Sequence, residues 1–474
     1  MNAVTELGRV HLVGIGGAGM SAVAGLLAAR GVAVSGSDAK DGPALAALRA
    51  AGVEVHVGHD AAHVADAQTL VVSSAVRPDN VELAAAQARG IRVLHRSQAL
   101  AALMVDRRTV AVAGAHGKTT TSAMVAVALL EAGLDPSYAI GGTVLTDAGP
   151  AEGVGGARHG NGDVLVAEAD ESDGSFLNYR PTIAVVTNVE PDHLDHYGTR
   201  EAFEEAFGRF AGQVQPGGHL VACADDDGAL RLAASARSGG VHVVTYGTSA
   251  DADVRLSDVH PTAVGGVRGL LHGLSEGGPV ELVLTVPGLH NALNATAAWV
   301  VARVLGVSGA SAARGLGAFR GTGRRFEHRG QAHGVRVVDD YAHHPIEVAA
   351  LLRAARPVAG GGRVRVLFQP HLYSRTKTFA DEFATALALA DDVVVTEVYA
   401  AREDPDPAVS GAMIVERLVA AGRPARFVAD REAAARALGA AARPGDLLLT
   451  VGAGDVTELA PQVLAAVRPA SGSP

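Results

Sequence analysis

Short apolar runs alternate with longer alanine-rich stretches along most of the chain. The apolar runs end in Gly, Asn or Asp or lead into a glycine loop, as in RVHLVG (9–14), TVAVAGA (109–115), TIAVVTN (182–188) and DLLLTVGAGD (446–455). A short run that is apolar at successive positions is typical of a strand buried on both faces of a sheet. Such strands, alternating with helical stretches, predict parallel sheets covered by helices on both faces. The fold class predicted from this pattern is therefore α/β.

Two interruptions of the pattern divide the chain into three parts. With 474 residues, the chain is long enough for about three domains. A fresh strand–loop–helix unit begins at LMVDRRTV (103–110), and RGTGRRFE (320–327) interrupts the alternation again. Before the second interruption, residues 270–288 predict a β-hairpin with a Gly-Gly pair at its turn. The domains expected from these boundaries are residues 1–106, 107–321 and 322–474.

The composition argues against several classes of function. The net charge is −10 and there is no basic run, which argues against a nucleic-acid-binding protein. The single cysteine, Cys223, excludes a disulfide within the chain and fits a reducing compartment. No run reaches the roughly 18 apolar residues that a membrane span needs, and the first residues lack a signal-peptide pattern. We therefore expect a cytoplasmic protein that binds neither nucleic acid nor membrane.

A glycine loop follows the first predicted strand. Gly14, Gly16 and Gly19 fit the G-x-G-x-x-G pattern, in which backbone N–H groups at a helix start face a diphosphate. Asp38 ends the next predicted strand, where an acidic residue binds ribose hydroxyls. Taken alone, this loop predicts a dinucleotide site, and an NAD-dependent dehydrogenase is one interpretation. The residues expected at the diphosphate are Gly16, Gly17, Ala18, Gly19, Met20 and Ser21.

A second glycine loop, GAHGKTTT (114–121), follows another apolar run. We expect Lys118, at a helix start, to reach the β- and γ-phosphates of ATP and the Thr119 hydroxyl to bind Mg²⁺. The full phosphate-loop pattern has Gly six residues before the Lys, where this chain has Val112. A glycine-rich turn with an exposed lysine is therefore the alternative. The residues expected at the phosphates are Gly114, Ala115, His116, Gly117, Lys118, Thr119 and Thr120.

Acidic side chains follow the next two apolar runs, in AEADESD (167–173) and NVEPDHLDHY (188–197). In a doubly wound sheet, ligands gather at the carboxyl ends of the strands. We therefore expect these groups to converge on Lys118 and supply carboxylates for magnesium. For any one of these acids alone, the alternative is an exposed residue of a turn. A zinc site is not indicated, because the spacing gives no third ligand beside His193 and His196. The candidates are Glu168, Asp170, Glu171, Asp173, Asn188, Glu190, Asp192, His193 and Asp195.

A series of segments, in order along the chain, resembles the Mur ligases of peptidoglycan synthesis. The resemblance extends from about residue 11 to residue 455 and rests on GAHGKTTT, AEADESDGSF, NVEPDHLDHY, GLHNALNA, GTGRRFE, VDDYAHHPIEV and FQPHLYSRT. It implies a Rossmann-like UDP-binding domain, a central P-loop ATPase-type α/β domain and a C-terminal Rossmann-like α/β domain that binds an amino acid. It also implies that ATP phosphorylates a carboxylate, and that an amine then attacks the acyl phosphate.

Three segments narrow the resemblance within the family. The opening GIGGAGMS (14–21) and the segments DDYAHHP and FQPHLYSRT are most similar to the member that joins L-alanine to UDP-N-acetylmuramate. The nearest alternative is a ligase that recycles murein peptides. A further function class, a nucleotide switch or transport motor, would leave the acids and histidines at the strand ends unexplained. The oligomeric state is not predicted.

The resemblance implies a role for residues of every domain. Lys118 matches a γ-phosphate contact, and Thr119 and Glu168 match the ligands of one magnesium ion. His193 matches a ligand of a second magnesium ion, and Arg324 matches an arginine that reaches the ATP phosphates when the domains close. The other implied contacts are Asn291 and Asn294 at adenine, Asp340 at the ribose or hinge, Tyr341, His343 and Arg375 at alanine, and Ser73, Ser74 and Arg96 at the UDP-substrate.

Two positions depart from the family pattern. Several members have a carbamylated lysine on the helix after the DH motif, but here that helix contains no lysine (200–210). The second metal would then rely on His193, substrate and water, or on an acid such as Glu204 or Glu205. Some relatives have Arg directly after the His of FQPH, where this chain has Leu372. Arg375 would then bind the alanine carboxylate without a second arginine at position 372.

Overall fold

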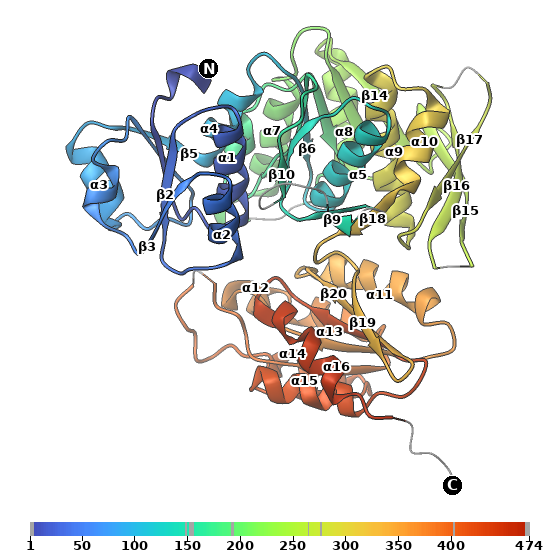
Figure 1. The fold of residues 1–474 in the computed structure, drawn as a ribbon. Helices are drawn as coiled ribbons and strands as arrows, with labels where there is room; N and C mark the ends of the chain where they lie inside the picture. Colours follow the sequence, from blue (N-terminus) through green and yellow to red (C-terminus); the bar gives the residue numbers. More distant parts are fainter. Residues whose placement is uncertain are drawn as a thin grey trace. The chain divides into compact units, whose positions relative to one another are not determined.

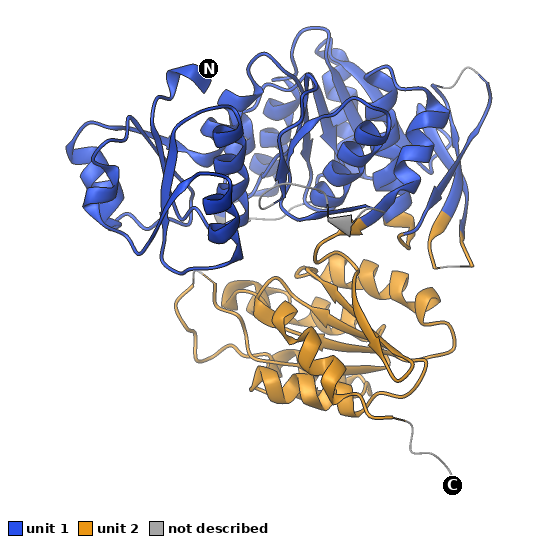
Figure 2. Ribbon diagram, in the orientation of Figure 1, with its two compact units in different colours: residues 1–260, 268–285, 291–320 blue, residues 261–267, 286–290, 321–474 orange. Residues whose placement is uncertain are grey.

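The structure is a computed structural model that describes residues 4–146, 149–150, 156–190, 194–263, 265–274, 277–401 and 403–469. The chain forms two compact units (Figure 2). Unit 1 comprises residues 1–260, 268–285 and 291–320, and unit 2 comprises residues 261–267, 286–290 and 321–474.

The first sheet of unit 1 has five parallel strands in the order β3-β2-β1-β4-β5. Helix α1 packs against α2 and α4, whereas α3 packs against the short helix η2 (Figure 1). The strands are β1 (Val10–Val13), β2 (Val34–Asp38), β3 (Glu54–Val57), β4 (Thr69–Val72) and β5 (Arg92–His95). The helices are η1 (Val4–Glu6), α1 (Ala18–Ala29), α2 (Pro43–Ala50), η2 (Ala61–Val64), α3 (Val81–Ala88) and α4 (Arg96–Met104).

The second sheet of unit 1 has the order β10-β7-β11-β6-β12-β13-β14-β15-β16-β17. Its central strand β6 pairs in parallel with β11 and β12. The strands are β6 (Arg108–Ala113), β7 (Ser137–Ala139), β10 (Ala157–Arg158), β11 (Val164–Glu168), β12 (Ile183–Val186), β13 (His219–Cys223), β14 (His242–Gly247), β15 (Val254–Pro261), β16 (Val267–His272) and β17 (Val280–Leu284). The accompanying helices are α5 (Lys118–Glu131), η3 (Ser175–Asn178), α6 (Leu194–Tyr197), α7 (Arg200–Ala211), α8 (Asp227–Ser238), α9 (Leu289–Val304) and α10 (Gly309–Gly317).

Three short strands complete this part of the chain: β8 (Val144–Thr146), β9 (Gly149–Pro150) and β18 (Phe319–Thr322). Strands β8 and β9 pair in antiparallel fashion. Strands β16 and β17 are neighbours in the large sheet, on either side of the Gly-Gly pair that predicted a hairpin turn.

Unit 2 contains a six-stranded sheet with the order β19-β20-β24-β21-β22-β23. Only β19 is antiparallel to its neighbour, and two apolar cores cover the two faces. Its strands are β19 (Glu327–Ala332), β20 (Val335–Asp340), β21 (Val364–Phe368), β22 (Asp392–Val395), β23 (Ala425–Phe427) and β24 (Leu447–Val451). Its helices are α11 (Pro345–Ala359), α12 (Tyr373–Thr378), α13 (Ala380–Leu387), α14 (Ala412–Ala420), α15 (Arg431–Ala440), η4 (Asp455–Leu459) and α16 (Ala460–Ala466).

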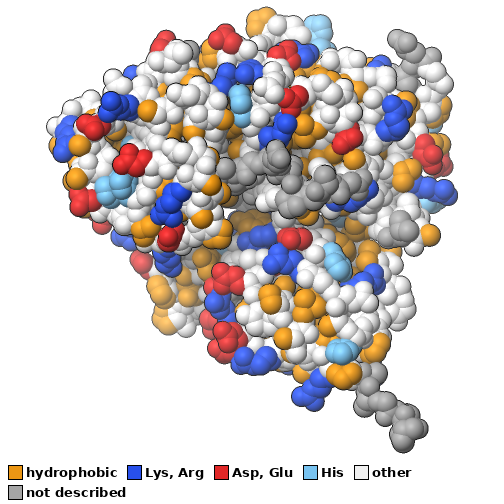
Figure 3. Space-filling model, in the orientation of Figure 1, with side chains coloured by type: hydrophobic (Ala, Val, Ile, Leu, Met, Phe, Trp, Pro, Cys, Tyr) orange, Lys and Arg blue, Asp and Glu red, His pale blue; other side chains and the backbone are white. Residues whose placement is uncertain are grey.

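The predicted α/β class is confirmed, since mostly parallel sheets are covered by helices. The predicted boundary after residue 106 lies inside unit 1, because the first two sheets pack into one compact body. The three-domain division stays a prediction. Basic and acidic side chains are interspersed on the face shown in Figure 3. Among the helices of the described residues, none combines the length and apolarity needed to cross a membrane.

Candidate active site

The second glycine loop connects β6 to α5. Gly114 has a φ of +135° and Gly117 a φ of +84°, a region that favours glycine. A Cβ on Gly114 would lie 2.1 Å from the Thr187 hydroxyl oxygen, so a side chain there would collide with the end of β12. The Asn188 side chain accepts a hydrogen bond from the His116 N–H and donates one to the His116 carbonyl, both at 3.0 Å. The loop is therefore fixed at the carboxyl ends of β6 and β12.

Lys118 begins α5, and its ammonium group lies within the loop. Nζ donates to the carbonyls of Gly114 (2.7 Å) and Ala115 (3.3 Å) and to Glu171 Oε1 (2.8 Å). Burial alone would lower the pKa of Lys118, but nearby carboxylates, Glu171 and Asp170 first, outweigh burial and raise it. Burial raises the pKa of Glu171 to about 7, against the opposite effect of Lys118. The Lys118 side chain is only 16% exposed, which contradicts the alternative of a turn with an exposed lysine.

Thr119 and Glu168 form a pair of oxygen ligands beside Lys118. The Thr119 hydroxyl donates to Glu168 Oε1 at 2.8 Å, and the Gly141 N–H donates to Oε2 at 2.7 Å. Thr120, the next residue of α5, is buried. Hydroxyl and carboxylate oxygens are ligands that Mg²⁺ accepts, so this pair fits one magnesium ion. Within the described ranges, no group of three or more His, Cys, Asp or Glu side chains is arranged to hold a metal.

The segment after β12 contributes a second acidic group. Glu190 Oε2 lies 3.6 Å from Nε2 of His116 in the glycine loop, and burial raises the pKa of Glu190. Asp192 and His193 lie outside the described residues, as does the side chain of Asp195. The metal role of His193 therefore stays a prediction.

Two asparagines of α9 occupy one face of that helix. Asn291 and Asn294 are three positions apart and each 8% exposed. A Cβ on Gly117 would lie 2.8 Å from Asn294 Oδ1, so Asn294 borders the glycine loop. Their adenine contact stays a prediction, on a helix that lies beside the loop.

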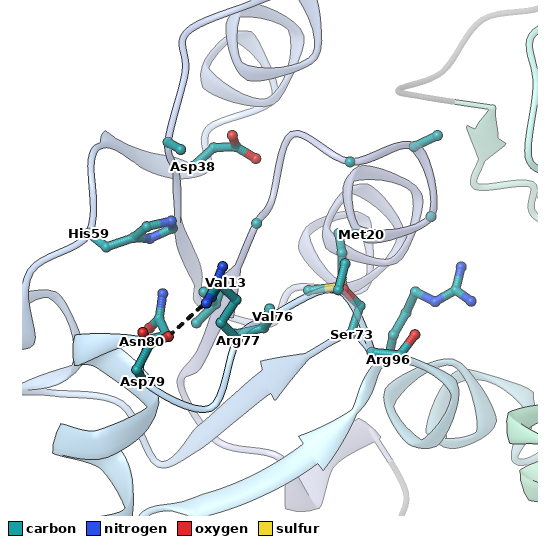
Figure 4. Close-up of a pocket in the computed structure, with 17 residues that line it drawn as sticks. Val13, Met20, Asp38, His59, Ser73, Val76, Arg77, Asp79, Asn80 and Arg96 are labelled. Atoms are coloured by element: carbon teal, nitrogen blue, oxygen red, sulfur yellow. Dashed lines mark ion pairs between the residues drawn. The ribbon is translucent and has the colours of Figure 1, made fainter. Parts of the chain in front are cut away.

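A cavity of about 540 Å³ opens beside the first glycine loop (Figure 4). Gly16 and Ser21 are not among its lining residues. The Gly16 N–H donates to Asp38 Oδ2 at 2.9 Å, and the buried Ser21 hydroxyl donates to the Ala18 carbonyl at 3.1 Å. The other predicted UDP-substrate residues all line the cavity: Gly17, Ala18, Gly19, Met20, Asp38, Ser73, Ser74 and Arg96.

Some residues of the cavity wall carry no sequence motif. His59, Arg77, Asp79 and Asn80 line it, and Arg77 pairs with Asp79 at 3.5 Å (Figure 4). Asn80 alone had a signal that could have identified it as a structural residue, because Asn before a helical stretch is a preferred N-cap. Its side chain accepts from the first turn of α3.

One of these lining residues, His59, contacts a buried carboxylate. Glu82 is fully buried; its Oε2 accepts from the Ser37 hydroxyl at 2.5 Å, and its Oε1 lies 2.8 Å from His63 Nδ1. His59 Nδ1 lies 3.2 Å from Oε2. Burial raises the pKa of Glu82, but hydrogen bonds from His11, Ser37 and His63 outweigh it and lower the pKa to about 2. Glu82 is therefore charged at neutral pH and orients His59, which lines the cavity.

Arg324 belongs to unit 2, where backbone carbonyls hold its guanidinium. Nη2 donates to the carbonyls of Gly452 (2.6 Å) and Gly454 (3.0 Å), and Nε lies 3.5 Å from Asp339 Oδ2. Its Cζ lies 4.8 Å from the centre of the Tyr341 ring, which permits a cation–π contact. These contacts anchor Arg324 to the loop after β24, and its ATP contact stays a prediction.

Asp340 ends β20 and is nearly buried. Its carboxylate accepts hydrogen bonds from the N–H groups of Phe326 (2.7 Å) and Ala342 (2.8 Å). Burial raises the pKa of Asp340 to about 6, although the charge of Arg325 acts in the opposite direction. Asp340 thus fixes the turn that follows β20, and its ribose or hinge role stays a prediction.

The predicted alanine residues form an aromatic and basic cluster in unit 2. The rings of Tyr341 and His343 lie 5.1 Å apart, and those of His343 and His371 lie 5.9 Å apart. Burial first, and then the positive charge of Arg375, lower the pKa of His343 to about 3, against the opposite effect of Glu347. Tyr399 stacks on His371 at 5.8 Å, a contact that sequence motifs do not indicate. The structure thus brings Tyr341 and His343 together, with Arg375 close enough to act on the imidazole.

The two departures from the family pattern have structural counterparts. Leu372 is buried and has a φ of +68°, so its side chain packs inside the protein. The Glu204 carboxylate pairs with Arg200 and Arg231, each at 2.9 Å, and is already neutralised by two cations. Glu205 is exposed on the same helix. A metal role for either acid stays a prediction.

Comparisons with known proteins match nearly the whole chain. Residues 9–108 match the profile described as "Mur ligase family, catalytic domain", residues 112–302 the "Mur ligase middle domain", and residues 324–454 the "Mur ligase, glutamate ligase domain". The UDP-N-acetylmuramate–L-alanine ligase of Kineococcus radiotolerans is 62% identical over 98% of this chain and 97% of its own length.

Solved structures agree with these matches. The crystal structure of UDP-N-acetylmuramate-alanine ligase MurC from Thermotoga maritima is 31% identical, covers 96% of this chain and 98% of its own, and superposes with a TM-score of 0.80. A murein peptide ligase from Psychrobacter arcticus is 25% identical, with coverage of 97% and 98% and a TM-score of 0.70. The similarity extends over all three matched regions, and the chain belongs to the Mur ligase family.

Proposed function

We propose that this chain is an ATP-dependent ligase that joins L-alanine to the carboxylate of UDP-N-acetylmuramate, releasing ADP and phosphate, in the cytoplasmic synthesis of peptidoglycan precursors. One observation carries the proposal. Unit 1 has two glycine loops at strand ends, and only the second is followed by Lys118 and Thr119, with Glu171 and Glu168 against them. The loops therefore bind different phosphates: the first binds a substrate handle and the second binds the reacting nucleotide.

The first loop binds the UDP part of the substrate in this proposal. The N–H groups at the start of α1 face the diphosphate, as helix N-termini favour anions. Arg96 supplies a positive charge at the cavity wall, and Asp38 and His59, which also line the cavity, would contact the nucleoside. The muramate carboxylate extends from this cavity toward the second loop.

The second loop binds ATP. Lys118 exchanges its carbonyl contacts for the γ-phosphate, and its charge stabilises the transferring phosphoryl group. Thr119 and Glu168 hold one magnesium ion, and we infer a second at His193. When bound, magnesium neutralises charge on the phosphate oxygens. Glu171 keeps Lys118 protonated and close to the loop.

The reaction needs two displacements, because a carboxylate is a poor electrophile. A muramate carboxylate oxygen attacks the γ-phosphorus and ADP leaves, which gives an acyl phosphate. The alanine amine then attacks the carbonyl carbon, and the tetrahedral intermediate expels phosphate. Arg324 steadies charge on the phosphates during the first displacement.

Unit 2 binds the amino-acid substrate in this proposal. The planar guanidinium of Arg375 suits two parallel hydrogen bonds to the alanine carboxylate. His343 stays neutral at physiological pH, because burial lowers its pKa to about 3, so it does not repel the alanine amine. Tyr341 forms the adjoining wall, and Asp340 holds the turn on which both residues lie.

Phosphate release from ATP tests the proposal directly. The purified chain should release phosphate only when UDP-N-acetylmuramate and L-alanine are both present. Release without either substrate would indicate a motor, and a change in nicotinamide absorbance would indicate a dehydrogenase. Replacing L-alanine by a murein tripeptide distinguishes the recycling ligase, and glycine and serine measure amino-acid selectivity.

A further inference from the structure

The N-terminal end of α4 docks on the segment that follows β11, and this junction joins the two phosphate sites. Arg96 Nη2 lies 3.2 Å from Asp170 Oδ2. Beside it, Asn178 Nδ2 donates to the Ser97 hydroxyl at 2.7 Å. The junction therefore contains a charged contact and a neutral one. Both belong to unit 1.

On one side of the junction, Arg96 lies directly on the first glycine loop. It lines the cavity together with Gly17 and Gly19. A Cβ on Gly19 would lie 2.1 Å from Arg96 Nη1, so the guanidinium covers the start of α1. Figure 4 shows Arg96 extending from α4 at the opposite side of the cavity from Asp38. A diphosphate bound at this loop would meet the same guanidinium that Asp170 holds.

On the other side of the junction, Asp170 lies in the sequence between the two glutamates whose carboxylates contact the second loop. Glu168, two residues before it, accepts the Thr119 hydroxyl, and Glu171, the next residue, accepts Lys118. The Asp170 carboxylate also accepts the Ser172 N–H at 3.1 Å, which fixes the turn. Its negative charge acts on Lys118 as well as on Arg96. Asp170 thus has a cation of each phosphate site as a neighbour.

We propose that Asp170 is a positioning residue that fixes Arg96. Arg96 in turn fixes the diphosphate at the first loop, and this sets the distance between the muramate carboxylate and the second loop. The inference rests on the proposed function, and it gives Asp170 a role that differs from the magnesium ligand expected from the sequence. Asp170 touches neither substrate. Its contribution appears in the chemical step, because a misplacement of about 1 Å can slow a reaction by roughly 100-fold.

The substitution Asp170→Asn tests this role, because it keeps the shape of the side chain and removes its charge. We expect kcat to fall roughly 10- to 100-fold. The KM for MgATP and the equilibrium Kd for UDP-N-acetylmuramate should stay within about threefold, since the loops themselves are intact. Asp170→Glu restores the carboxylate and should recover part of kcat. In a double-mutant cycle with Arg96→Gln, the effects on kcat should not add, because the two side chains act as one pair.

Asn178→Ala is the matched control. Asn178 lies in the same junction and donates to the Ser97 hydroxyl at 2.7 Å, so this variant removes the neutral contact and leaves the Arg96–Asp170 pair in place. This variant should keep kcat within about twofold. The fluorescence of the single tryptophan, Trp299, which is buried in unit 1, verifies that each variant is folded.

The outcomes separate the inference from the function on which it rests. If the unmodified protein releases phosphate without both substrates, the proposed function fails. If the unmodified protein requires both substrates but Asp170→Asn keeps its kcat, the positioning role fails. A raised KM for MgATP with unchanged kcat would also overturn it, because Asp170 would then act on the nucleotide. Additive effects in the cycle would contradict the pairing with Arg96.

Discussion

Removing Lys118 leaves a buried carboxyl group without its cation, and the cost can be calculated from the structure. The Glu171 side chain is 1% exposed, and its Oε1 lies 2.8 Å from Lys118 Nζ. With Lys118 present, the pKa of Glu171 is about 7, and Lys118 acts to lower it. In Lys118→Met the pKa must therefore rise above 7, so the carboxyl group is protonated in the folded protein at pH 7.

An unfolded chain would release that proton, because the ordinary pKa of Glu is 4.5. The difference between 4.5 and 7 corresponds to about 3 kcal/mol of unfolding free energy at pH 7. A raised carboxyl pKa makes stability fall as pH rises above the unfolded value. The cost is therefore absent near pH 4.5 and grows by about 1.4 kcal/mol per pH unit up to pH 7.

The double variant Lys118→Met/Glu171→Gln is the control that removes the titrating group. Relative to Lys118→Met, it should be more stable by about 3 kcal/mol at pH 7 and equally stable near pH 4.5. Urea unfolding followed by Trp299 fluorescence measures the difference, since this single tryptophan is buried in unit 1. Parallel pH profiles for the two variants would show that Glu171 does not titrate as a buried group and would refute the reasoning.

Three further substitutions test separate parts of the site. Lys118→Ala should lower kcat by at least roughly 100-fold while calorimetric Kd for UDP-N-acetylmuramate stays unchanged; loss of both would contradict the division between the loops. Glu82→Gln should lower the free energy of unfolding by about 3 kcal/mol at pH 7, because the pKa of Glu82 is about 2 in the folded protein and 4.5 in the unfolded chain. This difference, measured by urea unfolding, should vanish as pH falls from 4.5 to 2. A difference that stays constant with pH would contradict the charged, buried state of Glu82. Arg375→Ala should raise the KM for L-alanine roughly 100-fold and leave that for ATP unchanged in initial-rate assays, with Arg375→Lys between the two; an unchanged alanine KM would remove Arg375 from the site.

The parts of the site that lie within one strand–loop–helix segment were accessible from the sequence. Gly14 and Gly114 each follow a buried strand directly, and Lys118 begins the helix after the second loop, so local spacing is enough to place them at a sheet edge. The convergence of Glu168 and Glu171 on the second loop followed from the parallel arrangement of β6 and β11. In each case a rule about one strand end determined the position.

Contacts between distant segments were not accessible in the same way. Arg96 and Asp170 are 74 positions apart, and neither position specifies the other. Glu82 contacts Ser37 of β2, His63 of η2 and His59 of the loop before η2. A glutamate on a helix usually indicates an exposed position. Only the packed structure shows that this carboxylate is buried and charged.

The same argument applies to the different roles that we propose for the two glycine loops. Both present backbone N–H groups at a helix start, and those groups recognise phosphate without specifying what is attached to it. The difference lies in the side chains that follow. In the first loop the Gly16 N–H donates to Asp38, and Arg96, Ser73 and Ser74 line the cavity beside it, an arrangement that suits a bound diphosphate. The second has Lys118 among carboxylates, an arrangement that stabilises charge as it moves between oxygens. A G-x-G-x-x-G match therefore predicts a diphosphate, and the residues beyond the loop decide whether that diphosphate reacts.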